Sequence, residues 1–246
     1  MRLTVLGPWG AYPAAGEASA GYLVEHQGHQ LLLDCGSGVL SVVQKHTRLQ
    51  DLSAAIISHR HHDHIADLGC LQYACLIDSD LRRREVPLPI YIASDGLSTN
   101  EPYRSMKGSE IRSVSEHDVL HLHGMECSFF KTFHEVYCLG IKIKAGGKTI
   151  VYTADSCFDE SLISFCQGAD LLIAETSFYA EFQNARQYGH MNTTEVGYLA
   201  KMARPGKVIL THLPHFGNRE QLVDEVSQQY DGEIFLAKCG LNFEIV

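Results

Sequence analysis

Residues 58–64 read Ser58-His59-Arg60-His61-His62-Asp63-His64 and directly follow an apolar run over 54–57. Such a run is typical of a strand buried on both faces, so the histidines are predicted to lie in a loop at a strand end. Residues two apart in extended chain point the same way, so His59 and His61 can share one metal ion. Asp63 and His64 follow the turn and can reach a second ion beside it. Imidazole and carboxylate ligands favour Zn²⁺, with Mn²⁺ or Fe²⁺ as alternatives.

The other interpretation of this stretch is a histidine-rich surface loop, because the chain has 14 histidines and most histidines in proteins bind no metal. Four coordinating groups within six residues, at this spacing, favour the metal site instead. His62 points to the opposite side of an extended chain and is not expected to be a ligand.

Outward from this stretch, apolar periodicity and turn signals predict alternating strands and helices. Strands are expected at Leu3–Gly7, Gly21–Glu25, Gln30–Cys35, 54–58, Leu88–Ala93, Leu139–Lys144, Lys148–Thr153, Ala169–Ala174, Lys207–Leu210 and Glu233–Ala237. Helices are expected at Val39–Thr47, Ile65–Ser79, Glu220–Tyr230 and from the capping box at Asn192 to a point before Pro205. Two β-rich halves, each carrying helices, predict two sheets stacked face to face with helices outside.

The pattern His-x-His-x-Asp-His in this sequence resembles the signature of the metallo-β-lactamase superfamily. The resemblance extends along the chain and implies an α/β (α+β) fold, a four-layer αββα sandwich formed by residues 1–246 as a single domain. Its further ligand motifs are matched by His134 in Phe133-His134-Glu135, Asp155 in Ala154-Asp155-Ser156 and His212 in Thr211-His212. The resemblance therefore implies two metal ions, with Asp155 bridging them. The other implied ligands are His59, His61 and His134 for one ion, and Asp63, His64 and His212 for the other.

Three features indicate the branch of the superfamily. Asp155 stands where many true β-lactamases carry cysteine, and an all-nitrogen-and-oxygen site suits ester and phosphodiester cleavage. The Thr-Pro-Gly-His pattern of glyoxalase II-type thiolesterases is missing around His134. Glu175 in Ala174-Glu175-Thr176 and His190 in Gly189-His190-Met191 resemble two tRNase Z motifs whose Glu and His help to protonate the leaving oxygen. The resemblance thus implies catalytic roles for Glu175 and His190, and Asp63 is expected to orient the attacking hydroxide.

The chain departs from tRNase Z in one respect that bears on substrate. That family inserts a long tRNA-gripping arm between the motifs matched by His134 and Asp155, whereas twenty residues separate them in this sequence. These twenty residues are filled by the predicted hairpin. The chain is more similar to short bacterial hydrolases close to the cyclic-phosphate phosphodiesterases of phosphonate metabolism, which lack the arm too.

The function predicted from these observations is a dinuclear-metal-dependent phosphodiesterase. It would cleave small phosphate esters, including cyclic or nucleotide esters, with a metal-bridging hydroxide. The alternatives are a tRNase Z-like RNA-processing nuclease and a carboxyl-ester, lactone or thiolester hydrolase. A non-enzymatic metal-binding module is the least favoured class, because no ligand of the site is missing. Fold and metal site are shared across these chemistries, so they do not choose among the substrates.

Composition and net charge limit the binding partners and the cellular location expected for the protein. The net charge of −9 disfavours a large nucleic-acid interface, and no apolar stretch is long enough for a membrane span. The N-terminus reads as a strand and not as a signal peptide, which predicts a cytoplasmic protein whose eight cysteines are reduced and mostly buried. A homodimer is left open. Asp34 and Gly36 are expected to shape a loop under the site, and His215 to lie in a surface loop near it.

Overall fold

The computed structural model describes residues 1–96 and 103–246 and contains two seven-stranded sheets. The first sheet has the order β14-β1-β2-β3-β4-β5-β6. Its strands are β1 (Arg2–Gly7), β2 (Gly21–His26), β3 (His29–Leu33), β4 (Ala54–Ile57), β5 (Leu88–Ala93), β6 (Ser109–Val114) and β14 (Asn242–Glu244). Strands β3 to β6 are parallel to one another, and the remaining pairs in this sheet are antiparallel.

The second sheet has the order β13-β12-β11-β10-β9-β8-β7. Its strands are β7 (Val119–Leu122), β8 (Met125–Lys131), β9 (Leu139–Ala145), β10 (Lys148–Tyr152), β11 (Leu171–Glu175), β12 (Lys207–Thr211) and β13 (Glu233–Leu236). Strands β10 to β13 are parallel, and β7 to β10 form an antiparallel meander. Each sheet therefore combines an antiparallel part with a parallel part.

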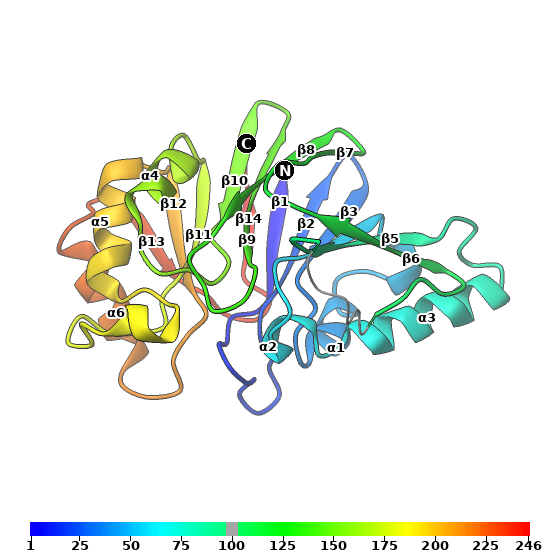
Figure 1. Cartoon of the computed structure of the whole chain (residues 1–246), viewed down its shortest axis with the longest axis horizontal. Coiled ribbons are helices and arrows are strands. Elements are labelled where there is room, and N and C mark those ends of the chain that lie inside the picture. The colour runs from blue at the N-terminus through cyan, green and yellow to red at the C-terminus, as the bar shows by residue number, and fades with distance from the viewer. Residues whose placement is uncertain (97–102) are drawn as a thin grey trace.

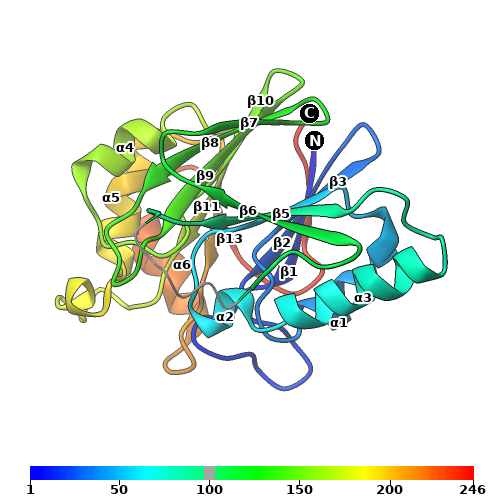
Figure 2. The same ribbon diagram turned by 45° about the vertical axis from the view of Figure 1, so that its right-hand side comes forward.

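Helices cover the outer face of each sheet, as Figures 1 and 2 show. The helices on the first sheet are α1 (Val39–Val43), α2 (His62–Ile65) and α3 (Leu68–Asp80), and those on the second are α4 (Glu160–Cys166), α5 (Thr193–Ala203) and α6 (Arg219–Ser227). The layers are thus helix, sheet, sheet and helix. The predicted αββα sandwich is confirmed.

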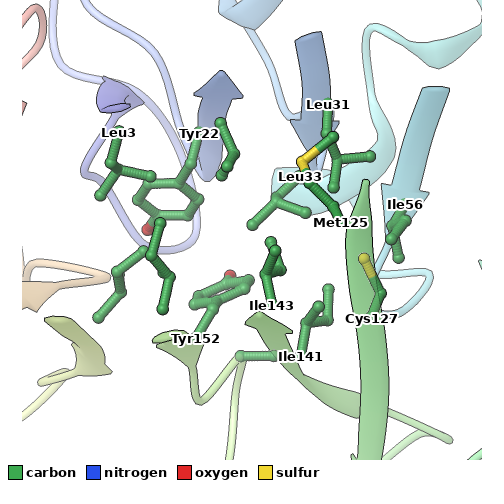
Figure 3. Close-up of a cluster of buried hydrophobic side chains, with 14 of the residues drawn as sticks. Leu3, Tyr22, Leu31, Leu33, Ile56, Met125, Cys127, Ile141, Ile143 and Tyr152 are labelled. Carbon is green, nitrogen blue, oxygen red and sulfur yellow. The ribbon is translucent and has the colours of Figure 1, made fainter. Parts of the chain in front are cut away.

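The core between the sheets explains why the strands read as continuous apolar runs. In β4, Ala54 and Ile56 point into the space between the sheets, whereas Ala55 and Ile57 point to the helices outside. Both faces of the strand are buried, so polar residues have no place in it. Figure 3 shows the inner cluster, in which the rings of Tyr22 and Tyr152 meet from opposite sheets with their centroids 4.9 Å apart.

Three predicted helices differ from the observed ones, and one of them, Glu220–Tyr230, is observed as α6, which begins at Arg219 and ends at Ser227. The predicted helix Ile65–Ser79 is divided, because residues 62–65 form the separate short helix α2 and α3 begins only at Leu68. The polar residues 62–64 have no apolar period, so periodicity alone gave no sign of a helical turn there. The predicted helix Val39–Thr47 ends at Val43. The capping box at Asn192 and Glu195 is confirmed at the start of α5.

Strands β3, β4, β8, β10, β11 and β12 all run toward one edge of the sandwich. The predicted site residues lie in the segments that leave these strands, except Glu175, which is the last residue of β11. Within the described ranges, no helix combines the length and apolarity needed to cross a membrane. All eight cysteines lie in these ranges and are free, and six of them are buried.

Candidate metal centre

The seven predicted ligands come together at this edge in two groups that share Asp155. His59 and His61 lie in the loop after β4, and Asp63 and His64 lie in α2. Within each group, one nitrogen or oxygen atom per residue lies within 4.8 Å of those of the other members. The groups are His59, His61, His134 and Asp155, and Asp63, His64, Asp155 and His212. This division equals the two ligand sets that the resemblance implies, and His62 belongs to neither.

The separations in the first group suit one tetrahedral ion. Bonds of 2.0–2.2 Å at a tetrahedral angle place two ligand atoms about 3.3–3.6 Å apart. The Nε2 atom of His59 lies 3.5 Å from Oδ2 of Asp155, and Nε2 of His134 lies 3.8 Å from it. The Nδ1 atom of His61 is 3.0 Å from Nε2 of His134.

The second group has the same spacing. The Nε2 atom of His212 lies 3.1 Å from Oδ2 of Asp63 and 3.3 Å from Oδ2 of Asp155. The Nε2 atom of His64 lies 3.5 Å from Oδ2 of Asp63 and 3.3 Å from Oδ1 of Asp155. Asp155 contacts members of both groups, which is the position that a bridging carboxylate requires.

Three buried polar atoms at this centre have no hydrogen-bond partner. They are Nε2 of His59, Nε2 of His64 and Oδ1 of Asp155, and Nε of Arg84 is the only other such atom among the described residues. A buried polar atom left without a partner costs about 1–3 kcal/mol, so proteins rarely tolerate three in one place. The residues fit a pair of divalent cations, which would satisfy all three atoms.

The electrostatics of the centre also favour bound cations. Burial lowers the pKa of His59 well below its usual value, so the ring is neutral and has a lone pair to offer. Burial opposes the ionisation of Asp155, but the neighbouring His212 and His64 hold its pKa well below the ordinary range. Burial also opposes protonation of His64, yet Asp155 and Asp34 raise its pKa well above the usual value. A field that attracts a proton to this position attracts a metal ion as well.

One buried carboxylate orients a histidine of each group. Asp34 accepts hydrogen bonds from the backbone N–H and the hydroxyl of Ser58 at 2.7 and 2.9 Å, and from Nδ1 of His64 at 2.8 Å. Because the hydroxyl of Ser58 donates its only proton to Asp34, it must accept from Nδ1 of His59, 3.1 Å away. Nδ1 of each ring therefore donates its hydrogen away from the centre, and Nε2 is the atom of each ring that faces the centre and is left for a metal ion.

A second carboxylate repeats this arrangement on the opposite sheet. The hydroxyl of Ser177 donates to Oε2 of Glu175 at 2.9 Å, so it must accept from Nδ1 of His212 at 2.8 Å. The Nδ1 atom of His190 bonds the other carboxylate oxygen, Oε1, at 3.1 Å. Glu175 thus connects a predicted ligand with the predicted proton donor. The relay roles of Ser58 and Ser177 were not predicted, because a serine beside a ligand motif carries no distinctive pattern.

Glycines allow the backbone to pass directly against two of the ligands. The carbonyl of Gly189 accepts a hydrogen bond from Nδ1 of His134 at 2.9 Å, and a Cβ atom on Gly189 would lie 2.6 Å from that nitrogen. A Cβ atom on Gly10 would lie 2.6 Å from the ring of His212. His212 itself has a left-handed backbone with φ of 54°, an arrangement that costs a non-glycine residue about 1–2 kcal/mol. Such strain is concentrated at functional sites.

Comparisons with known proteins agree with this geometry. Residues 29–213 match the model of the beta-lactamase superfamily domain. The chain belongs to the metallo-β-lactamase superfamily. It is 41% identical over 244 residues to the probable metallo-hydrolase YhfI of Bacillus subtilis, covering 99% of this chain and 100% of that protein. The crystal structure of YhfI matches with a TM-score of 0.95 at 40% identity and covers 98% of each chain.

More distant structures share the fold. The short form of human tRNase Z has a TM-score of 0.77 at 21% identity, with all of both chains covered (100% of each). A diphosphatase of the PhnP family has a TM-score of 0.74 at 17% identity, covering 100% of this chain and 98% of that one. The two proteins differ in activity, so the superfamily fold by itself does not name the substrate.

In this superfamily member, His190 lies between the two ligand groups and an adjoining recess. Its ring centroid is 5.0 Å from that of His212 and 5.3 Å from that of His134. Burial opposes protonation of the ring, but the Glu175 carboxylate raises the pKa of His190 to about 9. His215 is exposed and lies in a loop, as predicted, and together with Tyr12 it lines the same recess.

Proposed function

We propose that the protein is a hydrolase with two divalent metal ions, Zn²⁺ being favoured, and that it cleaves small phosphodiesters. The observation that carries this proposal is the placement of His190. The ring adjoins both ligand groups, bonds a buried carboxylate and borders an open recess. Cleavage of an alkyl phosphodiester expels an alkoxide that needs a proton, so a donor at this position suits phosphodiester hydrolysis, whereas a simple metal-binding module needs none.

The ions, when bound, would lower the pKa of water and neutralise charge that builds up on the phosphate oxygens. The chain supplies the remaining groups. The Oδ2 atom of Asp63 accepts the backbone N–H of Ala11 at 2.9 Å, which fixes the carboxylate at the mouth of the centre. Burial acts to raise the pKa of Asp63, but the neighbouring His212 and His64 lower it by more, so its net pKa lies below the usual value. The carboxylate therefore stays ionised and can orient the attacking water.

His190 is proposed to protonate the leaving oxygen. Glu175 accepts a hydrogen bond from Nδ1, so the proton on Nε2 is the one available for transfer. The raised pKa of about 9 keeps the ring protonated at neutral pH. Cations bound beside the ring would lower this value toward neutrality, where proton transfer is most efficient. Glu175 therefore both orients the donor and sets its charge.

The relatives support the hydrolase part of the proposal. YhfI carries the name of a probable metallo-hydrolase, and the more distant structures include a tRNase Z and a diphosphatase. RNA processing is disfavoured in this chain, because the segment between His134 and Asp155 is occupied by the tight β9–β10 hairpin. The net charge of −9 also weakens extended contact with phosphates.

A substrate panel tests the proposal. Purified, zinc-loaded protein is assayed with bis(p-nitrophenyl) phosphate, an alkyl phosphodiester, a β-lactam, a lactone and precursor tRNA. We expect turnover of the two small phosphodiesters and negligible cleavage of the β-lactam. Robust lactone or β-lactam turnover without phosphodiester turnover would reverse the assignment. Cleavage of precursor tRNA at rates that rival the small esters would establish the nuclease alternative.

The donor role is tested with two leaving groups. A p-nitrophenolate leaves readily without a proton, whereas an alkoxide does not, and general-acid assistance is worth about 10²–10⁴-fold. We expect His190→Ala to lose activity in that range on the alkyl ester and much less on the p-nitrophenyl ester. The matched control is His117→Ala, because the side chain of His117 is 86% exposed and belongs to neither the ligand groups nor the recess. Equal losses on both esters would leave His190 as a binding residue only.

A further inference from the structure

An aromatic-walled recess opens beside the metal centre. It has a volume of about 280 Å³ and is bordered on one side by His190 and His212. Phe178, Phe216 and Tyr12 form much of its remaining wall. Phe216 is 45% exposed and Tyr12 is 58% exposed, although both lie next to a polar site. Exposed aromatic surface at the mouth of a catalytic site commonly marks the place where a ligand binds.

Two of the lining rings, Phe178 and Phe216, belong to a cluster of three phenylalanine rings. The ring centroid of Phe178 lies 5.6 Å from that of Phe182 and 6.4 Å from that of Phe216. The centroids of Phe182 and Phe216 lie 5.5 Å apart. These separations are typical of packed aromatic rings. Phe178 also packs against His190 at 6.3 Å, which joins the aromatic wall directly to the proposed proton donor.

Two further lining residues, Tyr12 and His215, belong to a stack of three rings. His215 lies between Trp9 and Tyr12, with centroids 4.6 and 3.7 Å away and nearly parallel planes. The Nε2 atom of His215 bonds the backbone carbonyl of Tyr12 at 2.6 Å. This contact fixes the imidazole as part of the wall and uses its hydrogen, so His215 is held rigidly before any ligand arrives. A preformed wall loses little entropy on binding.

We propose that this recess is a subsite for a planar aromatic ring carried by the phosphate ester, either a nucleobase or an aryl group. The inference rests on the proposed function, in which the ester phosphate lies at the metal centre. The lining contains no lysine or arginine, so the recess attracts a neutral ring and not further phosphates. Its volume of about 280 Å³ is at the lower end of ligand pockets, about 300–1,000 Å³, so it accepts one ring system and not a length of RNA.

The size of the effect follows from ring stacking. Stacking of a base on protein aromatic rings is worth about 1–3 kcal/mol per base, which corresponds to about 5- to 150-fold in affinity. A phosphate ester that carries the ring should therefore bind about 5- to 150-fold more tightly than one that lacks it. A pocket without this role would bind both equally, since the phosphate contacts are the same.

Titration calorimetry on the zinc-loaded protein tests the subsite with three probes. Adenosine 5′-monophosphate carries a nucleobase, phenyl phosphate carries an aryl ring, and ribose 5-phosphate carries neither. We expect one or both of the first two to bind more tightly than ribose 5-phosphate, and the stronger one identifies the kind of ring. Equal affinities for all three would overturn the subsite while leaving the phosphate site intact. No binding of any probe would reject the subsite and the proposed function together.

A variant locates the subsite. Phe216→Leu should bring the affinity of the preferred ring-bearing probe close to that of ribose 5-phosphate while two zinc equivalents remain bound. Tyr73→Leu is the matched control, because Tyr73 is 64% exposed on α3 and lies outside the recess. Trp9 is the single tryptophan of the chain and stacks on His215, so its fluorescence should respond to the ring-bearing probe alone. An unchanged preference in both Phe216→Leu and Tyr12→Leu would contradict the assignment.

Discussion

Replacing Asp34 with asparagine tests whether one carboxylate sets the tautomer of histidines in both ligand groups. The two side chains have nearly the same size, so the change creates no cavity. Oδ1 of Asp34 accepts the N–H of Ser58, and Oδ2 accepts from the Ser58 hydroxyl, from Nδ1 of His64 and from the hydroxyl of Tyr152 at 2.9 Å. An amide cannot accept on both sides, because one of its two terminal atoms is a donor.

Each orientation of the asparagine damages the site. If its oxygen faces the N–H of Ser58, its NH₂ group faces Nδ1 of His64, which must become an acceptor. The hydrogen of that ring then moves to Nε2, the atom that should bind metal. If the amide is reversed, the buried N–H of Ser58 faces another donor and loses its partner, at a cost of about 1–3 kcal/mol.

The expected loss is in zinc affinity. Removing the partner of a metal-ligating histidine typically lowers metal affinity about 10–100-fold, which is about 1.4–2.7 kcal/mol. Competition with a chromophoric chelator measures the affinity, and thermal unfolding of the metal-free variant shows whether it folds. Asp170→Asn is the control, because Asp170 bonds the N–H of Thr149 at 2.8 Å, away from the site. Wild-type zinc affinity in Asp34→Asn would refute the reasoning.

Four further predictions follow from the same contacts. Ser177→Ala removes the partner of Nδ1 of His212 without forcing the other tautomer, so zinc affinity should fall about 10-fold, at the mild end of the range, in the same competition assay. Gly10→Ala places a Cβ atom 2.6 Å from the ring of His212, so elemental analysis should find about one zinc equivalent fewer. The control Gly69→Ala, whose Cβ would meet nothing closer than 3.9 Å, should keep both zinc equivalents. Asp155→Ala should lose both equivalents and activity, and unchanged metal content would reject the bridging role. Chelation should lower the Tm by roughly 8–16 °C per ion, because zinc at about 1,000 times its Kd stabilises the fold by about 4 kcal/mol, and scanning calorimetry with and without chelator measures this.

The sequence by itself determined the layers and the order of the ligand segments. Apolar runs such as 54–57 and the histidines that follow them are local patterns. A continuous apolar run without alternation indicates that both faces of the strand are buried. Local spacing also separates His59 and His61 from Asp63 and His64, and the resemblance supplied the remaining ligands. These features are readable because strand geometry depends on neighbouring residues of the chain.

Only the tertiary structure decided which groups support those ligands. Asp34 reaches Ser58 because β3 and β4 are adjacent, and nothing in the sequence states which strands are neighbours. The contact of Ser177 with His212 was not predicted for the same reason, and Asp34 was expected only to shape a loop. The aromatic recess is assembled from segments near residues 12, 178 and 216, which the fold brings together from three separate loops. Hydrogen-bond partners and ring contacts are set by the meeting of distant segments, so they follow from topology and packing and not from local pattern.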